Sequence, residues 1–107
     1  MKSTPMPVGF SDACRLPLPE GRRSVQVFED DVLEIRIAAS PGRGLQVPHE
    51  RDELYFVARG SGHYRINGQR VAVGVGDVLF AAARVEHGFE DCTDDFSVWV
   101  LFYGPPK

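Results

Sequence analysis

The stretch P-H-E-R-D-E-L-Y-F-V-A-R-G-S-G, residues 48–62, decides the fold of this chain. It places an imidazole, His49, and a carboxylate, Glu53, directly before a run of strand-forming residues that ends at Gly60. A second stretch, G-D-V-L-F-A-A-A-R-V-E-H at residues 76–87, supplies another imidazole, His87. We expect these two stretches to meet in space, so that the three side chains share one site.

The strand pattern continues on both sides of these stretches. Apolar and polar residues alternate with period two in residues 25–28 and 32–38, which is typical of half-buried strands. The last apolar run, F-S-V-W-V-L-F-Y at residues 96–103, is apolar on both faces, so it is expected to be central or covered by another subunit. Further short strands are expected at residues 54–58, 62–66, 69–73 and 77–81.

These strands predict an all-β fold. Asn67-Gly68 is the strongest short-range signal for a hairpin, and turn residues recur about every ten positions. No window holds a convincing helical period, so we expect an antiparallel sandwich or barrel over residues 24–107. Residues 1–23 are rich in proline and predict an irregular arm, laid over the surface or over a partner subunit.

Composition bounds the class of protein. The 107 residues fit one domain, and 43% hydrophobic with 25% charged residues is typical of a folded protein. The net charge of −3 is scattered, so nucleic acid is not an expected partner. No apolar run approaches the length of a membrane span or a signal peptide, which favours a cytoplasmic protein. Cys14 and Cys92 are expected to be reduced, although a disulfide between them stays open.

The two stretches resemble the paired motifs of small single-domain cupins. The first motif, G-x5-H-x-H-x3or4-E-x6-G, is matched by His49, Glu53 and Gly60, and the second, G-x5-P-x-G-x2-H-x3-N, by Gly76 and His87. The resemblance covers roughly residues 32–103 and implies a jelly-roll β-barrel with its site inside. The sequence departs from the motifs at Val47 for the first His, Ala82 for the Pro, Arg84 for the Gly and Asp91 for the Asn, and Gly42 and Gly44 are out of register for the opening Gly of the first motif.

The three site residues suit a metal. Positions four apart in an extended strand lie about 13 Å apart, so a shared site requires the chain to bend at residues 50–52. Two imidazoles and one carboxylate at His49, Glu53 and His87 suit divalent iron, manganese, nickel or zinc, and no nucleotide cofactor is expected. The alternative is that Glu53 pairs with Arg51 or Arg84, while the histidines line a pocket mouth.

Other residues are candidates for the pocket wall. Tyr55 and Val57 share the parity of Glu53 and should face the interior with it, as pocket or as core. Val47, in the place of the first motif histidine, is a further pocket candidate. Arg36 is polar within an otherwise apolar strand, and would either hold a substrate carboxylate or lie on a solvated outer face.

Three functions stay open from the sequence. The resemblance implies a metal-dependent enzyme, of dioxygenase, isomerase or lyase type, acting on a small polar molecule. A non-catalytic module that binds or senses a small metabolite is the second, and without metal Glu53 would serve as a general base. The third is an interaction domain, because the doubly apolar last strand and the proline-rich arm both indicate a homodimer.

Overall fold

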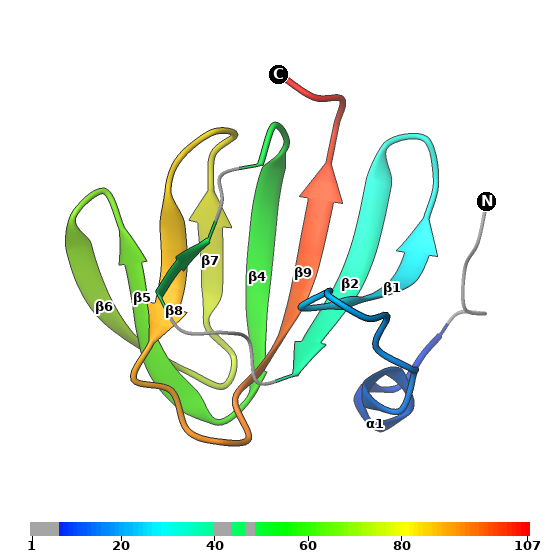
Figure 1. Cartoon of the computed structure of the whole chain (residues 1–107), viewed down its shortest axis with the longest axis horizontal. Coiled ribbons are helices and arrows are strands. Elements are labelled where there is room, and N and C mark those ends of the chain that lie inside the picture. Colours follow the sequence, from blue (N-terminus) through cyan, green and yellow to red (C-terminus); the bar gives the residue numbers. More distant parts are fainter. Residues whose placement is uncertain (1–6, 40–43, 47–48) are drawn as a thin grey trace.

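The computed structural model describes residues 7–39, 44–46 and 49–107 and consists of two antiparallel sheets (Figure 1). The five-stranded sheet has the order β1-β2-β9-β4-β7 and the four-stranded sheet the order β3-β8-β5-β6. The elements are α1 (Phe10–Cys14), β1 (Val25–Glu29), β2 (Leu33–Ala39), β3 (Gly44–Gln46), β4 (Asp52–Arg59), β5 (Ser61–Ile66), β6 (Gln69–Gly74), β7 (Val78–Ala81), β8 (His87–Glu90) and β9 (Ser97–Tyr103). The antiparallel jelly-roll class is confirmed, although no strand pairing among the described residues closes the two sheets into one barrel.

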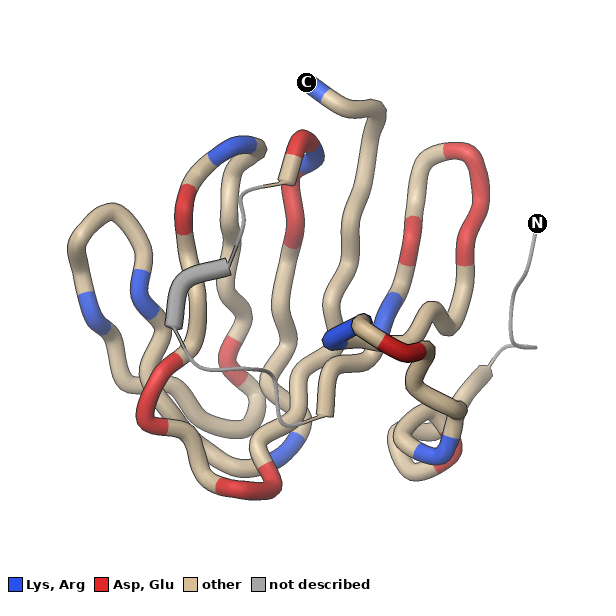
Figure 2. The backbone as a smooth tube through the Cα atoms, viewed as in Figure 1, with Lys and Arg blue, Asp and Glu red and all other residues tan. Residues whose placement is uncertain are grey.

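Strand β9 lies in the middle of the five-stranded sheet, paired with β2 on one side and β4 on the other. It carries no charged residue (Figure 2). Val98 and Val100 are buried in the core between the sheets, while Trp99 faces the outer side. The expectation that a strand apolar on both faces is central is therefore confirmed.

The core between the sheets is aromatic. Tyr55 of β4 packs edge-on against Phe89 of β8, with ring centroids 5.0 Å apart, and Phe89 also contacts Phe96 at 5.1 Å. Val57 lies in the same cluster, as its parity with Tyr55 predicts. Aromatic rings in offset or edge-on contact bury large apolar areas, so this cluster holds the two sheets together.

The sequence predicts an irregular arm before β1, but part of this segment is helical. Residues 10–14 form the short helix α1, whose Ala13 N–H donates to the carbonyl of Gly9 at 2.9 Å. The helix packs on the outer face of the five-stranded sheet, with Phe10 edge-on to Trp99 at 6.2 Å. One helical turn is too short to show a period, and tertiary packing rather than propensity stabilises it.

Two strands were missed by sequence reasoning. Strands β3 and β8 have three and four residues, too short for alternation to be recognised, and β8 contains Gly88. The hairpin at Asn67-Gly68 is confirmed, since both residues have positive φ between β5 and β6. The connection expected at residues 40–44 lies outside the described residues except for Gly44, which belongs to β3.

Neither Cys14 nor Cys92 forms a disulfide. The part of the chain that the structure describes contains no helix with the length and apolar character needed to cross a membrane.

The closing glycine of the first motif, Gly60, is required by both backbone and space. Its φ is +77°, and a Cβ there would meet Thr93 and lie 2.9 Å from the Cα of Phe96. Gly68 has a similar φ of +75°, but a Cβ there would meet nothing within 4 Å. Substitutions at Gly60 and Gly68 therefore separate two effects of a side chain: the strain of a positive φ, which both positions share, and the steric clash, which only Gly60 has.

We expect Gly60→Ala to lower the free energy of unfolding by at least about 2 kcal/mol, because backbone strain and overpacking add. Gly68→Ala should lose only the strain contribution, about 1 kcal/mol. Urea unfolding of both variants measures the difference. Equal losses would contradict a steric role for the loop that faces Gly60.

The outer face of the five-stranded sheet is apolar and only partly covered by α1. On the edge strand β7, Val78 and Phe80 are 54% and 49% exposed, and they pair with Phe56 and Leu54 of β4 on the same face. An exposed edge strand with large apolar side chains is a surface that natural proteins normally cover. The homodimer expected from the sequence stays a prediction, with this face as its contact.

We expect the protein to sediment as a dimer at micromolar concentration, and Phe80→Glu to sediment as a monomer, because a buried unpaired charge would oppose the contact. Val71→Glu is the matched control, since Val71 is 49% exposed on β6 of the other sheet and should leave the dimer intact. A monomeric parent protein would contradict the prediction.

Candidate functional site

The two sheets bring a carboxylate and an imidazole from distant parts of the chain into contact. Glu53 is the second residue of β4 and His87 the first of β8, and the His87 Nε2 atom lies 2.5 Å from the Glu53 Oε1 atom. Both side chains are almost completely buried, with about 1% of each residue exposed. The expected meeting of the two motif stretches is therefore confirmed for this pair.

Hydrogen bonds fix the orientation of the His87 ring. The Nδ1 atom lies 2.8 Å from the carbonyl oxygen of Val85, and because a carbonyl can only accept, Nδ1 carries a proton and donates. Nε2 then faces the Tyr55 hydroxyl at 2.8 Å as well as Glu53. Burial raises the pKa of Tyr55 far above its ordinary value, helped by the charge of Glu53, so the phenol stays protonated.

The pKa of His87 is raised. Burial alone lowers it, but the hydrogen bond with Glu53, the Val85 carbonyl and the charge of Glu53 outweigh that effect. The contact with Glu53 therefore favours the charged form of the His87 imidazole. Oε1 of Glu53 is paired with His87 in this way, whereas Oε2 forms no hydrogen bond of acceptable geometry within the described part of the chain.

His49 lies beside this pair and, with Glu53, lines a cavity between the sheets. It precedes β4, and the chain bends at residues 50 and 51 between His49 and the strand. A bend at residues 50–52 was expected, because an extended strand would hold His49 and Glu53 too far apart. Its ring packs edge-on against Phe102 at 5.0 Å between centroids, and its centroid is 6.5 Å from that of His87. His49 is exposed, and the ranges 7–39, 44–46 and 49–107 contain no group of three His, Cys, Asp or Glu residues placed to hold a metal ion.

The segment that carries His49 is tied down by its backbone neighbours. The Arg84 N–H donates to the His49 carbonyl at 2.6 Å, and the Lys107 N–H donates to the Glu50 carbonyl at 2.8 Å. The Asp52 carboxylate pairs with the Lys107 ammonium and accepts from the Ala83 N–H at 2.8 Å, contacts that lower its pKa. The bend before β4 is therefore a fixed part of the site's rim.

A cavity of about 630 Å³ opens beside the pair. Its apolar wall comes from β9 and β8, and its lining includes Glu53 and Tyr55. Of the pocket candidates, Tyr55 lines the cavity, while Val57 packs in the core between the sheets. Val47 lies outside the described residues.

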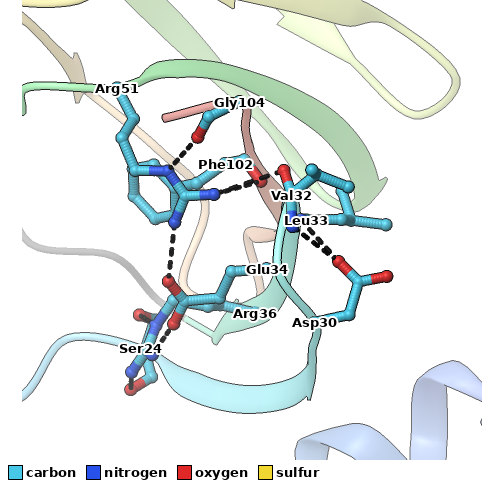
Figure 3. Close-up of polar contacts among 9 residues, drawn as sticks. All are labelled: Ser24, Asp30, Val32, Leu33, Glu34, Arg36, Arg51, Phe102 and Gly104. Carbon is cyan, nitrogen blue, oxygen red and sulfur yellow. Dashed lines mark hydrogen bonds and ion pairs between the residues drawn. The ribbon is translucent and has the colours of Figure 1, made fainter. Parts of the chain in front are cut away.

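Arg36 lines the same cavity and is 7% exposed, so its alternative placement on a solvated outer face was wrong. Its guanidinium is fully engaged, as Figure 3 shows. Nε donates to Ser24 Oγ at 2.6 Å, Nη2 to the Ser24 carbonyl at 2.9 Å, and Nη1 contacts Glu34 at 2.6 Å. Arg36 therefore fastens the chain before β1 to β2.

Arg51 approaches the other oxygen of Glu34, at 3.6 Å, and donates to the carbonyl of Gly104 at 2.9 Å (Figure 3). The alternative that Glu53 pairs with Arg51 or Arg84 was wrong, because Glu53 contacts His87. Arg51 lies near Glu34 instead, and Arg84 donates to the Lys107 carbonyl. Sequence reasoning missed the cavity positions of Glu34 and of Arg22 and Arg23. The alternation of β2 carried a signal for Glu34, since it shares the parity of Arg36.

Comparison with known proteins supports the fold. A family model described as "Cupin domain" matches residues 34–103. The uncharacterized protein SCO3923 of Streptomyces coelicolor is 36% identical over 62 residues, which are 58% of each chain. This chain therefore matches little more than half of that relative's length.

Solved structures resemble this one closely in fold. A cupin superfamily protein from Desulfitobacterium hafniense has a TM-score of 0.69, with 17% identity and 97% of each chain covered. KdgF from Halomonas sp. has a TM-score of 0.66, with 24% identity over 78% of this chain and 77% of its own. The DMSP lyase DddQ from Ruegeria pomeroyi has a TM-score of 0.64, with 22% identity over 84% of this chain and 51% of its own.

The raised pKa of His87 predicts how stability depends on pH. Because the folded-state pKa lies above the unfolded one, the stabilisation is complete below pH of about 6.5 and is lost as pH rises through the folded-state value. In chelator-treated protein we expect the midpoint of thermal unfolding to fall from pH 6 upward through that range. Glu53→Gln should flatten this dependence.

Glu86→Gln provides the control, since Glu86 is exposed and adjacent in sequence to His87. It removes the same charge without touching the pair. Differential scanning calorimetry between pH 6 and pH 9 avoids the ordinary titration range of carboxylates. A parent protein whose midpoint rises over that range would show that the pair is not charged in the folded state.

Proposed function

Because the chain belongs to the cupin domain family, we propose that it is an enzyme that moves a proton on a small polar molecule held in the cavity between its sheets. One observation carries this proposal: the buried carboxylate of Glu53 lines the cavity, and while its Oε1 atom is paired with His87, its Oε2 atom forms no hydrogen bond in the described part of the chain. A buried polar atom without a partner is costly, so a ligand that supplies a donor to Oε2 is the simplest reason for its retention.

In the proposed reaction Glu53 accepts a proton from the bound molecule. A general base must lie within hydrogen-bond reach of that proton, and a carboxylate on the cavity wall meets this requirement. His87 acts as a positioning residue, because its Nδ1–H bond to Val85 aims Nε2 at Glu53. The protonated Tyr55 hydroxyl can donate to an oxygen of the ligand that gains negative charge.

A metal ion was the other expectation for this site, and cupins commonly bind one. Glu53 and His87 offer donors suited to divalent iron, manganese, nickel or zinc. His49, the third expected ligand, is exposed and packs against Phe102, and the described residues form no group of three donors. The three-ligand centre stays a prediction, and the proposed proton transfer does not require a metal.

A non-catalytic module that binds or senses a metabolite is the second candidate. It is favoured by the contact between the Tyr55 hydroxyl and His87 Nε2, because two of the three polar groups near the cavity are then already occupied with each other. In that case Glu53 would only accept a hydrogen bond from the ligand. Turnover, rather than binding, separates the two candidates.

Proton exchange in heavy water tests the proposal without knowledge of the natural substrate. Pyruvate, 2-oxoglutarate and dihydroxyacetone carry acidic C–H bonds and serve as probes. We expect the protein, with chelator present, to accelerate loss of the C–H signal in proton NMR for at least one probe. Glu53→Gln should slow that exchange by about 100-fold, the usual contribution of a general base.

Glu50→Gln is the matched control, because Glu50 lines the same cavity but is exposed. It should exchange the probe at the parental rate. Equal exchange in the parent and Glu53→Gln would contradict the proposal, as would exchange that appears only after a divalent metal is added. A probe that stabilises the protein in thermal unfolding without any exchange would favour the binding module.

A further inference from the structure

The cavity has two chemically different ends. Cross-strand register places Glu34 of β2 and Glu53 of β4 on either side of Phe102 of β9. Two strand spacings separate them, about 10 Å at the backbone. Two residues further along each strand, Arg36 of β2 and Tyr55 of β4 flank Val100 of β9 in the same way. The β2 side of the cavity is therefore basic, and the β4 side carries the Glu53 carboxylate, whose Oε1 atom is paired with His87 and whose Oε2 atom has no hydrogen bond in the described part of the chain.

Two further arginines line the basic end. Arg22 and Arg23 lie in the turn before β1, where the Arg22 N–H donates to the Pro19 carbonyl at 3.1 Å. Neither guanidinium has an ion pair or a hydrogen bond in the described part of the chain, and Arg22 and Arg23 are both exposed. They contrast with Arg36, whose guanidinium is committed to Ser24 and Glu34.

The turn that carries them is held in place by the protein itself. Arg36 donates hydrogen bonds to both the side chain and the carbonyl of Ser24, the residue after Arg23 (Figure 3). These bonds fix the turn that carries Arg22 and Arg23 against β2. Glu34 offsets only one of the two charges of Arg36 and Arg51. The cavity lining as a whole holds four arginines, Arg22, Arg23, Arg36 and Arg51, and three glutamates, Glu34, Glu50 and Glu53, so positive charge is in slight excess.

We propose that Arg22 and Arg23 form an oxyanion subsite, so that the ligand of this cavity is a small organic acid with a carboxylate or phosphate group. Its anionic group binds the two guanidinium groups, and a hydroxyl or acidic C–H at its other end meets Glu53. The inference rests on the proposed function, since both use the same cavity. Arginine is suited to the task because its planar fork offers parallel donors to an oxyanion.

The size of the cavity agrees with this ligand class. A volume of about 630 Å³ lies within the range of small-molecule sites. The separation of the two ends, about 10 Å at the backbone, leaves room for a short carbon chain once the side chains extend into the space. A purely apolar ligand would offer no hydrogen bond to Glu53 Oε2 or to the guanidinium groups of Arg22 and Arg23.

Matched pairs of probes test the subsite. Glucuronate and glucose, lactate and 1,2-propanediol, and glycerol 3-phosphate and glycerol differ mainly in the presence of an oxyanion. Isothermal titration calorimetry should show tighter binding of the anionic member in at least one pair. Whether a carboxylate or the phosphate is preferred distinguishes the two sources of the oxyanion. Added salt should weaken anion binding, because the arginines are exposed to solvent.

The variant Arg22→Ala/Arg23→Ala should bind the anionic member about 10-fold more weakly, as expected from lost charge-assisted hydrogen bonds, with the neutral member unchanged. Arg65→Ala/Arg70→Ala is the control, since it removes the same charge from residues that pair with Glu90 outside this cavity. Glu53→Gln should retain the preference for the anion.

The outcomes separate this inference from the proposed function. Anions that bind the double variant as tightly as the parent would overturn the subsite while leaving the role of Glu53 standing. Neutral members that bind as well as anionic ones would do the same. If no probe of either kind binds, both the subsite and the proposed function are contradicted. Selective loss of anion binding without any proton exchange would support the subsite and contradict the enzyme.

Discussion

The structure depends on the apolar character of both faces of β9. No side chain of this strand carries a charge, and neighbouring strands β2 and β4 cover its two edges. Its inner face forms the apolar wall of the cavity, and its outer face receives α1 through Trp99. Because a central strand fixes the register of its neighbours, β9 also determines which residues of β2 and β4 stand opposite each other across the cavity.

The polar groups of the cavity follow from that register. Glu34 and Arg36 come from one neighbour of β9, and Glu53 and Tyr55 from the other. Buried charges are normally paired, and the structure pairs Arg36 with Glu34 and His87 with Glu53. The His87 contact engages Oε1 of Glu53 and leaves Oε2 without a hydrogen bond in the described part of the chain, which is why the proposed chemistry is assigned to this carboxylate rather than to Glu34.

Much of the fold could be predicted because its signals are local. Alternation of apolar residues located the longer strands, the Asn67-Gly68 turn is set by backbone angles, and the doubly apolar run of β9 identified the central strand. The helix α1 and the short strands β3 and β8 gave no such signal, since each depends on contacts with distant residues.

The site was predictable to a smaller extent. Motif spacing led to Glu53 and His87, and parity placed Tyr55 on the cavity side. The position of His49 against Phe102 depends on the bend before β4, which residue types permit but do not specify. Arg22 and Arg23 lie in a connecting segment, where only the contact of Arg36 with Ser24, 12 residues apart, brings them to the cavity.

The hydrogen bonds from Arg36 to Ser24 affect the entropy of ligand binding. A flexible arginine turn would lose backbone freedom when it closes on a ligand, at roughly 1–2 kcal/mol for each residue ordered. Here the buried guanidinium of Arg36 has already ordered the residue that follows the turn, during folding. Part of the ordering cost is thus borne by the folded state, and a weakly interacting small molecule can be retained by a cavity that needs little rearrangement to receive it.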